Sequence, residues 1–177
     1  IPGQVKTRLQ PELSEDQSVE LYCNFLLDLD KKFKPVTDFD TWYAVSPENF
    51  NEDILAAFVQ MDKYILQEGQ DLGERMQNAF QTLFSRGYSQ IVLIGSDIPS
   101  ITIDIIRHSL QGLQTNDCVL GPSKDGGYYL IALSKIYPNI FEDLPWSTSA
   151  VLEKTLQLLN KNGITYNLLA EIEDIDT

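Results

Sequence analysis

The chain has 177 residues, of which 43% are hydrophobic and 22% charged, and its formal net charge is −13 at pH 7. We expect one globular domain over residues 1–177, long enough to bury a core of its own. The negative charge counts against nucleic-acid and membrane-surface binding, because both require basic patches. No apolar run has membrane-spanning length and no signal-peptide pattern is present, so a cytoplasmic protein with two reduced thiols is expected.

Loop residues with two cations, Lys6 and Arg8, open the chain. No hydrophobic strand precedes them, and we expect the domain's leading strand to be missing from this sequence. If such a strand exists, Lys6 and Arg8 follow its carboxyl end, where an ammonium and a guanidinium can contact phosphate oxygens. Two solvated surface cations explain the same residues at least as well.

Apolar spacing, capping residues and turn signals predict alternating helices and strands along the rest of the chain. Ser14 and Gln17, for example, form a capping-box pattern before the first helix. In chain order the expected elements are a helix from Ser14 to about Phe33, a strand at 41–45, a short helix at 54–59, a strand at 64–66, a helix from Asp71 to Gly87, a strand at 91–94, a helix from Thr102 to Leu113, strands at 118–120 and 128–133, a helix between Thr148 and Asn162, and a strand at 164–169. This order predicts a three-layer α/β/α domain with a mostly parallel mixed sheet, in which 128–133 is antiparallel.

Two glycines, Gly69 and Gly73, flank the start of the helix that begins near Asp71. Glycine allows a ligand to approach the backbone closely, and the unpaired N–H groups of a helix start favour anions. The pattern is neither a dinucleotide fingerprint nor a P-loop, so as a phosphate motif it is weak. We nevertheless include Gly69 and Gly73 among the expected nucleotide contacts.

The stretch Ile91–Pro99 contains the residue that we consider most informative, Asp97. Four apolar residues indicate a strand covered on both faces, and Gly95 ends it. Ligands of open α/β sheets bind beyond the carboxyl ends of the strands, where Ser96 and Asp97 would lie. A carboxylate there can hold Mg²⁺, which takes one or two protein carboxylates together with water and phosphate oxygens. A turn-capping Asp97 before Pro99 is the structural alternative.

A glycine-rich loop, Gly121–Gly127, connects two predicted strands. Gly126 and Gly127 suit a backbone that passes close to a ligand. Asp125 offers a carboxylate that can accept a hydroxyl proton or bind a sugar hydroxyl. An Asp-Gly hairpin turn is the structural reading, and both readings can hold together.

Five blocks of the sequence resemble one known family, in the family's order: Pro2–Leu9, Gly69–Met76, Ile94–Pro99, Gly121–Leu130 and Trp146–Thr148. The family is that of the radical-SAM/selenodomain-associated transferases, which are glycosyltransferase-like proteins of the GT-A, nucleotide-diphospho-sugar transferase type. The sequence is more distantly similar to phospholactate and molybdopterin guanylyltransferases. The resemblance implies that Lys6 and Arg8 contact nucleotide phosphates and that Asp97 binds the metal, Mg²⁺ or Mn²⁺. It also implies that the region of Asp176 returns to the metal.

The reaction expected from these residues is metal-dependent glycosyl transfer from a nucleotide-sugar to a small-molecule acceptor, with Asp97 and Asp125 as catalytic residues. Nucleotide contacts are expected at Lys6, Arg8, Gly69, Gly73 and Ser96, and substrate contacts at Lys124, Gly126, Gly127 and Trp146. The alternatives are nucleotidyl transfer from a nucleoside triphosphate to a phosphorylated small molecule, and nucleotide binding without turnover. A Rossmann-type oxidoreductase is disfavoured because its glycine fingerprint is absent.

Overall fold

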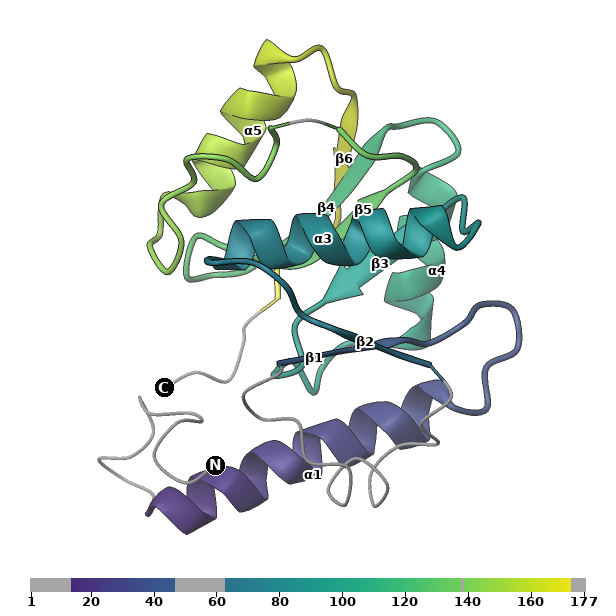
Figure 1. Ribbon diagram of the computed structural model, residues 1–177, viewed down its shortest axis with the longest axis vertical. Helices are drawn as coiled ribbons and strands as arrows, with labels where there is room; N and C mark the ends of the chain where they lie inside the picture. Colours follow the sequence, from purple (N-terminus) through teal and green to yellow (C-terminus); the bar gives the residue numbers. More distant parts are fainter. Residues whose placement is uncertain (1–13, 47–62, 138, 173–177) are drawn as a thin grey trace. The chain divides into compact units, whose positions relative to one another are not determined.

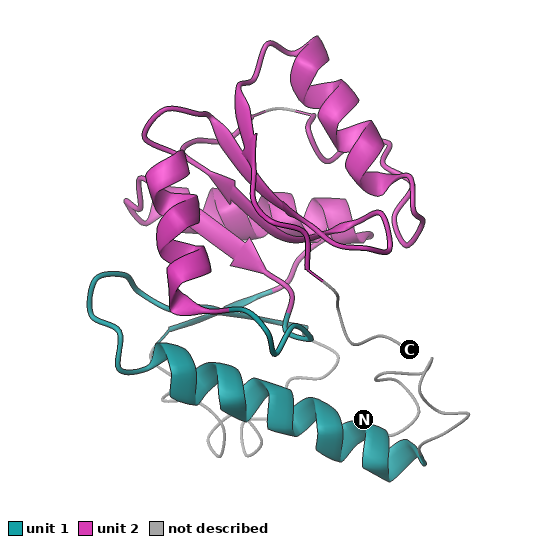
Figure 2. Cartoon of the chain, turned by 180° about the vertical axis from the view of Figure 1, so that it is seen from behind, with its two compact units in different colours: residues 1–66, 96–101, 174–177 teal, residues 67–95, 102–173 magenta. Residues whose placement is uncertain are grey.

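The computed structural model describes residues 14–46, 63–137 and 139–172. The chain divides into two compact units (Figure 2). Unit 1 comprises residues 1–66, 96–101 and 174–177, and unit 2 comprises residues 67–95 and 102–173. The helix expected at 54–59 lies outside the described residues, as do Lys6, Arg8 and Asp176.

A long helix and two short parallel strands are the regular elements in the described part of unit 1 (Figure 1). They are α1 (Glu15–Phe33), β1 (Tyr43–Val45) and β2 (Tyr64–Leu66). Ser14 and Gln17 form the predicted capping box at the start of α1. The Tyr43 hydroxyl donates to Oδ1 of Asp30 at 2.8 Å and so ties β1 to α1. Burial and this hydrogen bond to a carboxylate both raise the pKa of Tyr43.

A four-stranded mixed sheet with helices on both faces forms unit 2. Its elements are α3 (Leu72–Ser85), β3 (Ile91–Ile94), α4 (Ile103–Gly112), β4 (Cys118–Pro122), β5 (Tyr128–Leu133), α5 (Val151–Lys161) and β6 (Tyr166–Leu168). The strand order is β3-β5-β4-β6; β5 is antiparallel to both of its neighbours, and β4 is parallel to β6. Figures 1 and 2 show α3 and α4 on opposite faces of this sheet. The predicted three-layer arrangement with β5 as its antiparallel strand is therefore confirmed.

The core of unit 2 is centred on β4 and β5. Every residue of β4 is buried, and so is every residue of β5 except Tyr128, which is partly buried. In β3 only Ile91 is buried, although we expected a strand covered on both faces. The reason is that β3 is at an edge of the described sheet and has only β5 as a neighbour there. Both thiols are free: Cys118 is buried, whereas Cys23 is only partly buried.

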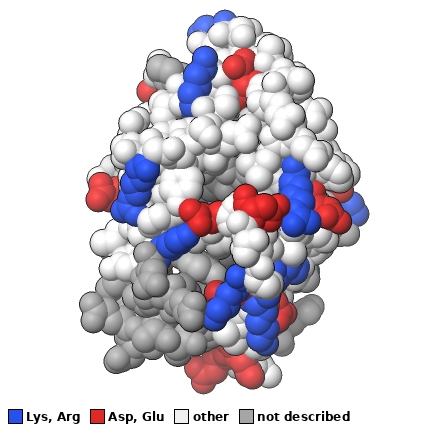
Figure 3. Space-filling view, turned by 90° about the vertical axis from the view of Figure 1, so that its right-hand side faces the viewer, with Lys and Arg blue, Asp and Glu red and all other residues white. Residues whose placement is uncertain are grey.

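Charged side chains of both signs lie on the surface of the described residues (Figure 3). On the face shown in Figure 3, Lys and Arg side chains are interspersed with Asp and Glu rather than gathered into a basic patch. Among the described residues, none of the helices is both long enough and apolar enough to cross a membrane.

Candidate functional site

The segment that carries Asp97 follows β3 and belongs to unit 1. Asp97 is partly buried, whereas Ile98 and Ile101 are only 3% and 0% exposed and anchor the segment. A turn with a 3.2 Å hydrogen bond from the N–H of Ile101 to the carbonyl of Ile98 closes it. The Ser96 hydroxyl lies 2.8 Å from the Tyr22 hydroxyl of α1. Asp97 therefore sits on a short segment whose two ends are both fixed.

The loop that contains Asp125 is a tight hairpin between β4 and β5. One carboxylate oxygen of Asp125, Oδ1, accepts hydrogen bonds from the Ser123 hydroxyl and from the N–H of Gly127, the latter at 2.9 Å. Gly126 has φ +87°, and a Cβ on it would lie 2.2 Å from the Ser149 carbonyl oxygen. The predicted Asp-Gly hairpin turn is thus confirmed, and glycine is required at 126 because its backbone and its neighbours leave no room for a side chain.

Two other segments of unit 2 are joined to this loop. The N–H of Leu152, in the first turn of α5, donates to the Gly126 carbonyl at 2.9 Å. Ile172, the last described residue, donates its N–H to the Pro122 carbonyl at 3.1 Å and accepts from the N–H of Lys124 at 3.3 Å. The side chains of Lys124 and Asp125 are both exposed. The loop therefore has a fixed backbone and presents its two charged side chains to solvent.

Trp146 lies against the start of α3, and the structure brings it together with Gly73. A Cβ on Gly73 would lie 2.9 Å from Nε1 and Cζ2 of the indole and 2.6 Å from the Phe141 carbonyl oxygen. The Tyr128 ring meets the indole edge to face, with centroids 6.4 Å apart and planes at 80°. Burial raises the pKa of Tyr128, and the neighbouring Thr155 hydroxyl lowers it by less. Gly73 is buried, so this glycine makes room for the chain's own segment 141–146.

At the start of α3, two N–H groups donate to the chain's own carboxylates. Asp71 accepts from the N–H of Glu74 at 2.8 Å, and the Glu74 carboxylate accepts from the N–H of Gln70 at 2.7 Å. Gly69 has φ +135° and its carbonyl accepts from Nε of Arg75 at 3.2 Å. Two carboxylates at a helix start already complement its dipole and would repel a phosphate. The positive φ in the turn before α3 therefore accounts for the glycine at position 69. The nucleotide contact expected at Gly69 stays a prediction.

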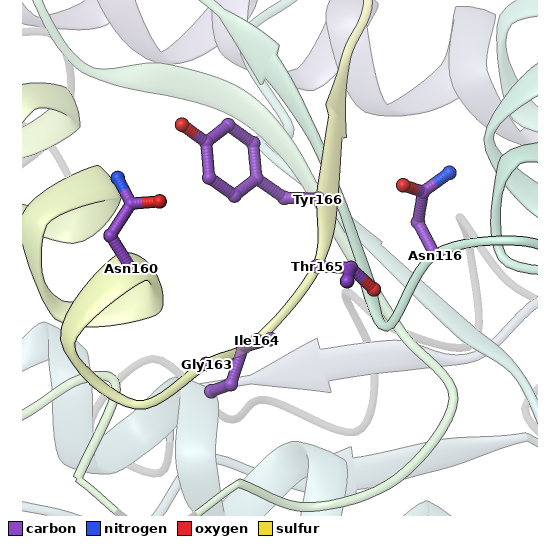
Figure 4. A pocket seen from close by; sticks show the side chains of 6 residues that line it. All are labelled: Asn116, Asn160, Gly163, Ile164, Thr165 and Tyr166. Atoms are coloured by element: carbon purple, nitrogen blue, oxygen red, sulfur yellow. The ribbon is translucent and has the colours of Figure 1, made fainter.

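No cluster of three or more His, Cys, Asp or Glu side chains that could hold a metal occurs within residues 14–46, 63–137 and 139–172. An open hollow of about 440 Å³ is lined by Asn116, Asn160, Gly163, Ile164, Thr165 and Tyr166 (Figure 4). Asn160 lies in the last turn of α5, and the other residues lie at the amino ends of β4 and β6, opposite to the loop that follows β4. None of them is charged, so the hollow offers no cation for a phosphate.

Sequence reasoning missed two residues that contact the Asp97 segment, Tyr22 and Lys32 of α1. Nζ of Lys32 donates to the carbonyl oxygens of Pro99 at 2.9 Å and Ile101 at 2.6 Å. Tyr22 lies within the predicted first helix, and no local pattern indicates its hydrogen bond to Ser96. No local sequence signal marks Lys32, because its partners are 67 and 69 residues away.

Residues 34–148 match the model of a family described as uncharacterized proteins conserved in bacteria, DUF2064. The match covers well over half of the chain. This chain belongs to the DUF2064 family. It is also 32% identical, with a TM-score of 0.90, to the crystal structure of a candidate nucleotide-diphospho-sugar transferase from Desulfovibrio desulfuricans G20, over 100% of this chain and 78% of that one.

Two more distant structures share the fold with this DUF2064 chain. One is CMP:2-keto-3-deoxy-manno-octonic acid synthetase complexed with CTP, at 14% identity and a TM-score of 0.56 over 86% of this chain and 82% of that one. The other is 4-diphosphocytidyl-2C-methyl-D-erythritol synthase from Anaerococcus prevotii DSM 20548. It is 11% identical, with a TM-score of 0.58, over 86% of this chain and 80% of that one. The predicted mixed α/β fold of the nucleotide-diphospho-sugar transferase type is therefore confirmed.

Proposed function

We propose that this protein is a divalent-metal-dependent transferase that uses a nucleotide-sugar donor and holds its metal on Asp97. The observation that carries the proposal is the position of Asp97, partly buried on a fixed segment three residues beyond the end of β3. The full-length similarity to a candidate nucleotide-diphospho-sugar transferase supports it. An association with radical-SAM proteins and a cytoplasmic location, both expected from the sequence, stay predictions.

The chemistry of the available donors fits a magnesium or manganese ion. Asp97 supplies a hard carboxylate oxygen, and Mg²⁺ typically uses one or two protein carboxylates and completes its shell with water and phosphate oxygens. Such a site does not need a cluster of three protein ligands. Asp176, outside the described residues, is the proposed second ligand. When bound, the ion neutralises charge that develops on the donor's diphosphate.

The other predicted site residues are proposed to contact either the donor or the acceptor. Lys6 and Arg8 are proposed to bind the donor's phosphates, as a point charge and a planar fork respectively. The other proposed nucleotide contact is Ser96. The contacts expected at Gly69 and Gly73 stay predictions, because the chain's own residues fill the space beside both glycines. The proposed acceptor contacts are Lys124, Gly126, Gly127 and Trp146. Of these, Lys124 has an exposed side chain and Trp146 a partly exposed one, so both are accessible to a ligand.

Asp125 is the proposed base in an inverting sugar transfer. The acceptor hydroxyl oxygen attacks the anomeric carbon, the bond from that carbon to the diphosphate oxygen breaks, and the nucleoside diphosphate leaves with the electron pair. The hydroxyl proton passes to Oδ2 of Asp125. This assignment rests on the turn geometry, in which Oδ1 carries both hydrogen bonds to the loop and Oδ2 carries neither.

Nucleotidyl transfer is the second candidate. The carboxylate of Asp125 accepts hydrogen bonds that stabilise the hairpin turn. An aspartate at this position is therefore explained without a role as catalytic base. In nucleotidyl transfer an acceptor phosphate attacks the α-phosphorus of a nucleoside triphosphate, pyrophosphate leaves, and no strong base is needed. Nucleotide binding without turnover remains the alternative from another class.

A thermal-shift screen of the full-length protein tests these candidates. Nucleotide-sugars and nucleoside triphosphates are compared with and without Mn²⁺ or Mg²⁺, for the wild type, Asp97→Ala and the control Asp28→Ala, which removes an exposed carboxylate of α1. A ligand at 100 times its Kd stabilises by about 2.7 kcal/mol, or about 5–11 °C for a chain of this size. We expect a metal-dependent shift with nucleotide-sugars that only Asp97→Ala abolishes. A shift confined to triphosphates would favour nucleotidyl transfer, and no shift with any ligand would contradict both.

A further inference from the structure

Two side chains of α1 hold the segment that carries Asp97 from both ends. Tyr22 meets Ser96, the residue before Asp97, with 2.8 Å between the hydroxyl oxygens. Lys32 donates from Nζ to the carbonyls of Pro99 and Ile101, at 2.9 and 2.6 Å. All of these residues belong to unit 1. The Asp97 segment is therefore tied to one rigid helix on each side of the carboxylate.

The environment of the Lys32 ammonium indicates a specific role. Lys32 is partly buried, and among the described residues no carboxylate lies within ion-pair distance of it. A partly desolvated ammonium needs acceptors for its three N–H groups, and two backbone carbonyls of one turn accept from two of them. Hydrogen bonds from a charged donor are stronger than neutral ones. Within the described residues, the positive charge of Lys32 thus contacts backbone carbonyls.

The contacts within the segment fix a different part of it. Its internal hydrogen bond from Ile101 to Ile98 is 3.2 Å long, which is at the weak end of the normal range. Ile98 and Ile101 are buried and fix the side of the turn that faces inward. They do not fix Ser96 or the carbonyl of Pro99, which are the groups that Tyr22 and Lys32 contact.

We propose that Lys32 and Tyr22 are positioning residues that hold the Ser96–Ile101 segment in the geometry in which the Asp97 carboxylate binds a divalent cation. This rests on the proposed function, in which Asp97 holds the metal. Groups that orient a metal ligand typically contribute 10–100-fold to metal affinity. Because Lys32 acts through the backbone and not on Asp97 itself, we expect the lower end of this range.

The test compares Lys32→Met with Lys31→Met, which removes the same charge from an exposed neighbouring position of α1. Mn²⁺ affinity is measured by electron paramagnetic resonance, and hydrogen exchange is followed at the amides of Ile98, Ser100 and Ile101. Lys32→Met should weaken Mn²⁺ binding about tenfold and speed exchange at these amides. Lys31→Met should change neither, and Lys32→Arg, which retains a cationic donor, should restore most of the affinity.

Two results overturn the proposal. One is an equal rate of hydrogen exchange at these amides in Lys32→Met and Lys31→Met, which would mean that Lys32 does not hold the segment. The other is faster exchange with unchanged Mn²⁺ affinity, which would mean that the segment is held for another reason. A wild type that binds no Mn²⁺ contradicts the proposed function itself and with it the role toward metal. If Lys32→Met fails to fold, Tyr22→Phe, which removes one oxygen atom, is judged by the same two measurements.

Discussion

Replacing Gly73 by alanine tests the contact between α3 and the Trp146 segment. Helix propensity predicts that the substitution raises the free energy of unfolding, whereas packing predicts that it lowers it. Within a helix, alanine is favoured over glycine by up to about 1 kcal/mol. In this structure a Cβ at position 73 would lie 2.6 Å from the Phe141 carbonyl oxygen and 2.9 Å from two atoms of the Trp146 indole. The first of these is a backbone atom, so the segment itself has to move.

The expected size of the effect follows from these distances. Inserting a methyl group into a filled site costs about 1–3 kcal/mol, and a backbone contact as short as 2.6 Å belongs to the upper part of that range. Subtracting the propensity gain leaves a net loss of about 1–2 kcal/mol. For a chain of this size the loss corresponds to a Tm lower by about 2–8 °C.

Thermal unfolding followed by circular dichroism measures this change. The matched control is Gln81→Ala, which introduces alanine at an exposed position of the same helix and should alter stability by less than about 0.5 kcal/mol. A Gly73→Ala protein with a Tm equal to or above that of the wild type would refute the packing of segment 141–146 on the start of α3.

Three further predictions concern other parts of the described structure. Ser147 has φ +64°, and Ser147→Gly should raise the free energy of unfolding by about 0.5–1 kcal/mol in thermal unfolding, because glycine adopts this conformation without strain. Asp117→Asn should lower stability by about 1 kcal/mol at pH 7, because hydrogen bonds from Tyr137 and Thr165 favour the Asp117 carboxylate and hold its pKa below the usual range. Burial raises the pKa of the Cys118 thiol to about 12, so a thiol reagent at pH 8 should label the partly exposed Cys23 and leave Cys118 unmodified, as mass spectrometry of native protein can measure.

Each of these predictions has a clear counter-result. A lower Tm for Ser147→Gly would show that the serine is not strained. For Asp117, a depressed folded-state pKa gives stability that is present above the unfolded pKa of about 3.9 and is lost as the pH falls through the folded pKa. The difference between wild type and Asp117→Asn should therefore shrink in urea titrations below about pH 4, and a constant difference would contradict it. Equal labelling of both thiols would contradict the burial of Cys118.

Most of the secondary structure was predictable because its signals are local. The capping box at Ser14 and the caps at Asp71 and Thr102 fixed the starts of α1, α3 and α4. The strand predicted at 128–133 has the same bounds in the structure. β4 extends two residues further than predicted, to Pro122. Gly121 and Pro122 were interpreted as loop residues, but they pair with Leu130 and Tyr128 of β5 beside a bulge.

The candidate site was predictable only in part, since its long-range contacts have no local pattern. The Asp-Gly turn at Asp125 follows from two adjacent residues and was found. The Lys32 contacts with Pro99 and Ile101 join residues almost 70 positions apart and were not. Gly73 was noticed for the right chemical reason, a close approach to its backbone. The group that approaches in the structure is the chain's own Trp146 segment.

The most direct test of the account is isothermal titration calorimetry of a nucleotide-sugar into the full-length wild type, Asp97→Ala and Asp28→Ala, with and without Mn²⁺. The proposal predicts binding that requires Mn²⁺, is weakened at least tenfold by Asp97→Ala, about 1.4 kcal/mol, and is unchanged by Asp28→Ala. Equal binding by the wild type and Asp97→Ala, or binding that is independent of Mn²⁺, would contradict the claim that Asp97 holds a catalytic metal.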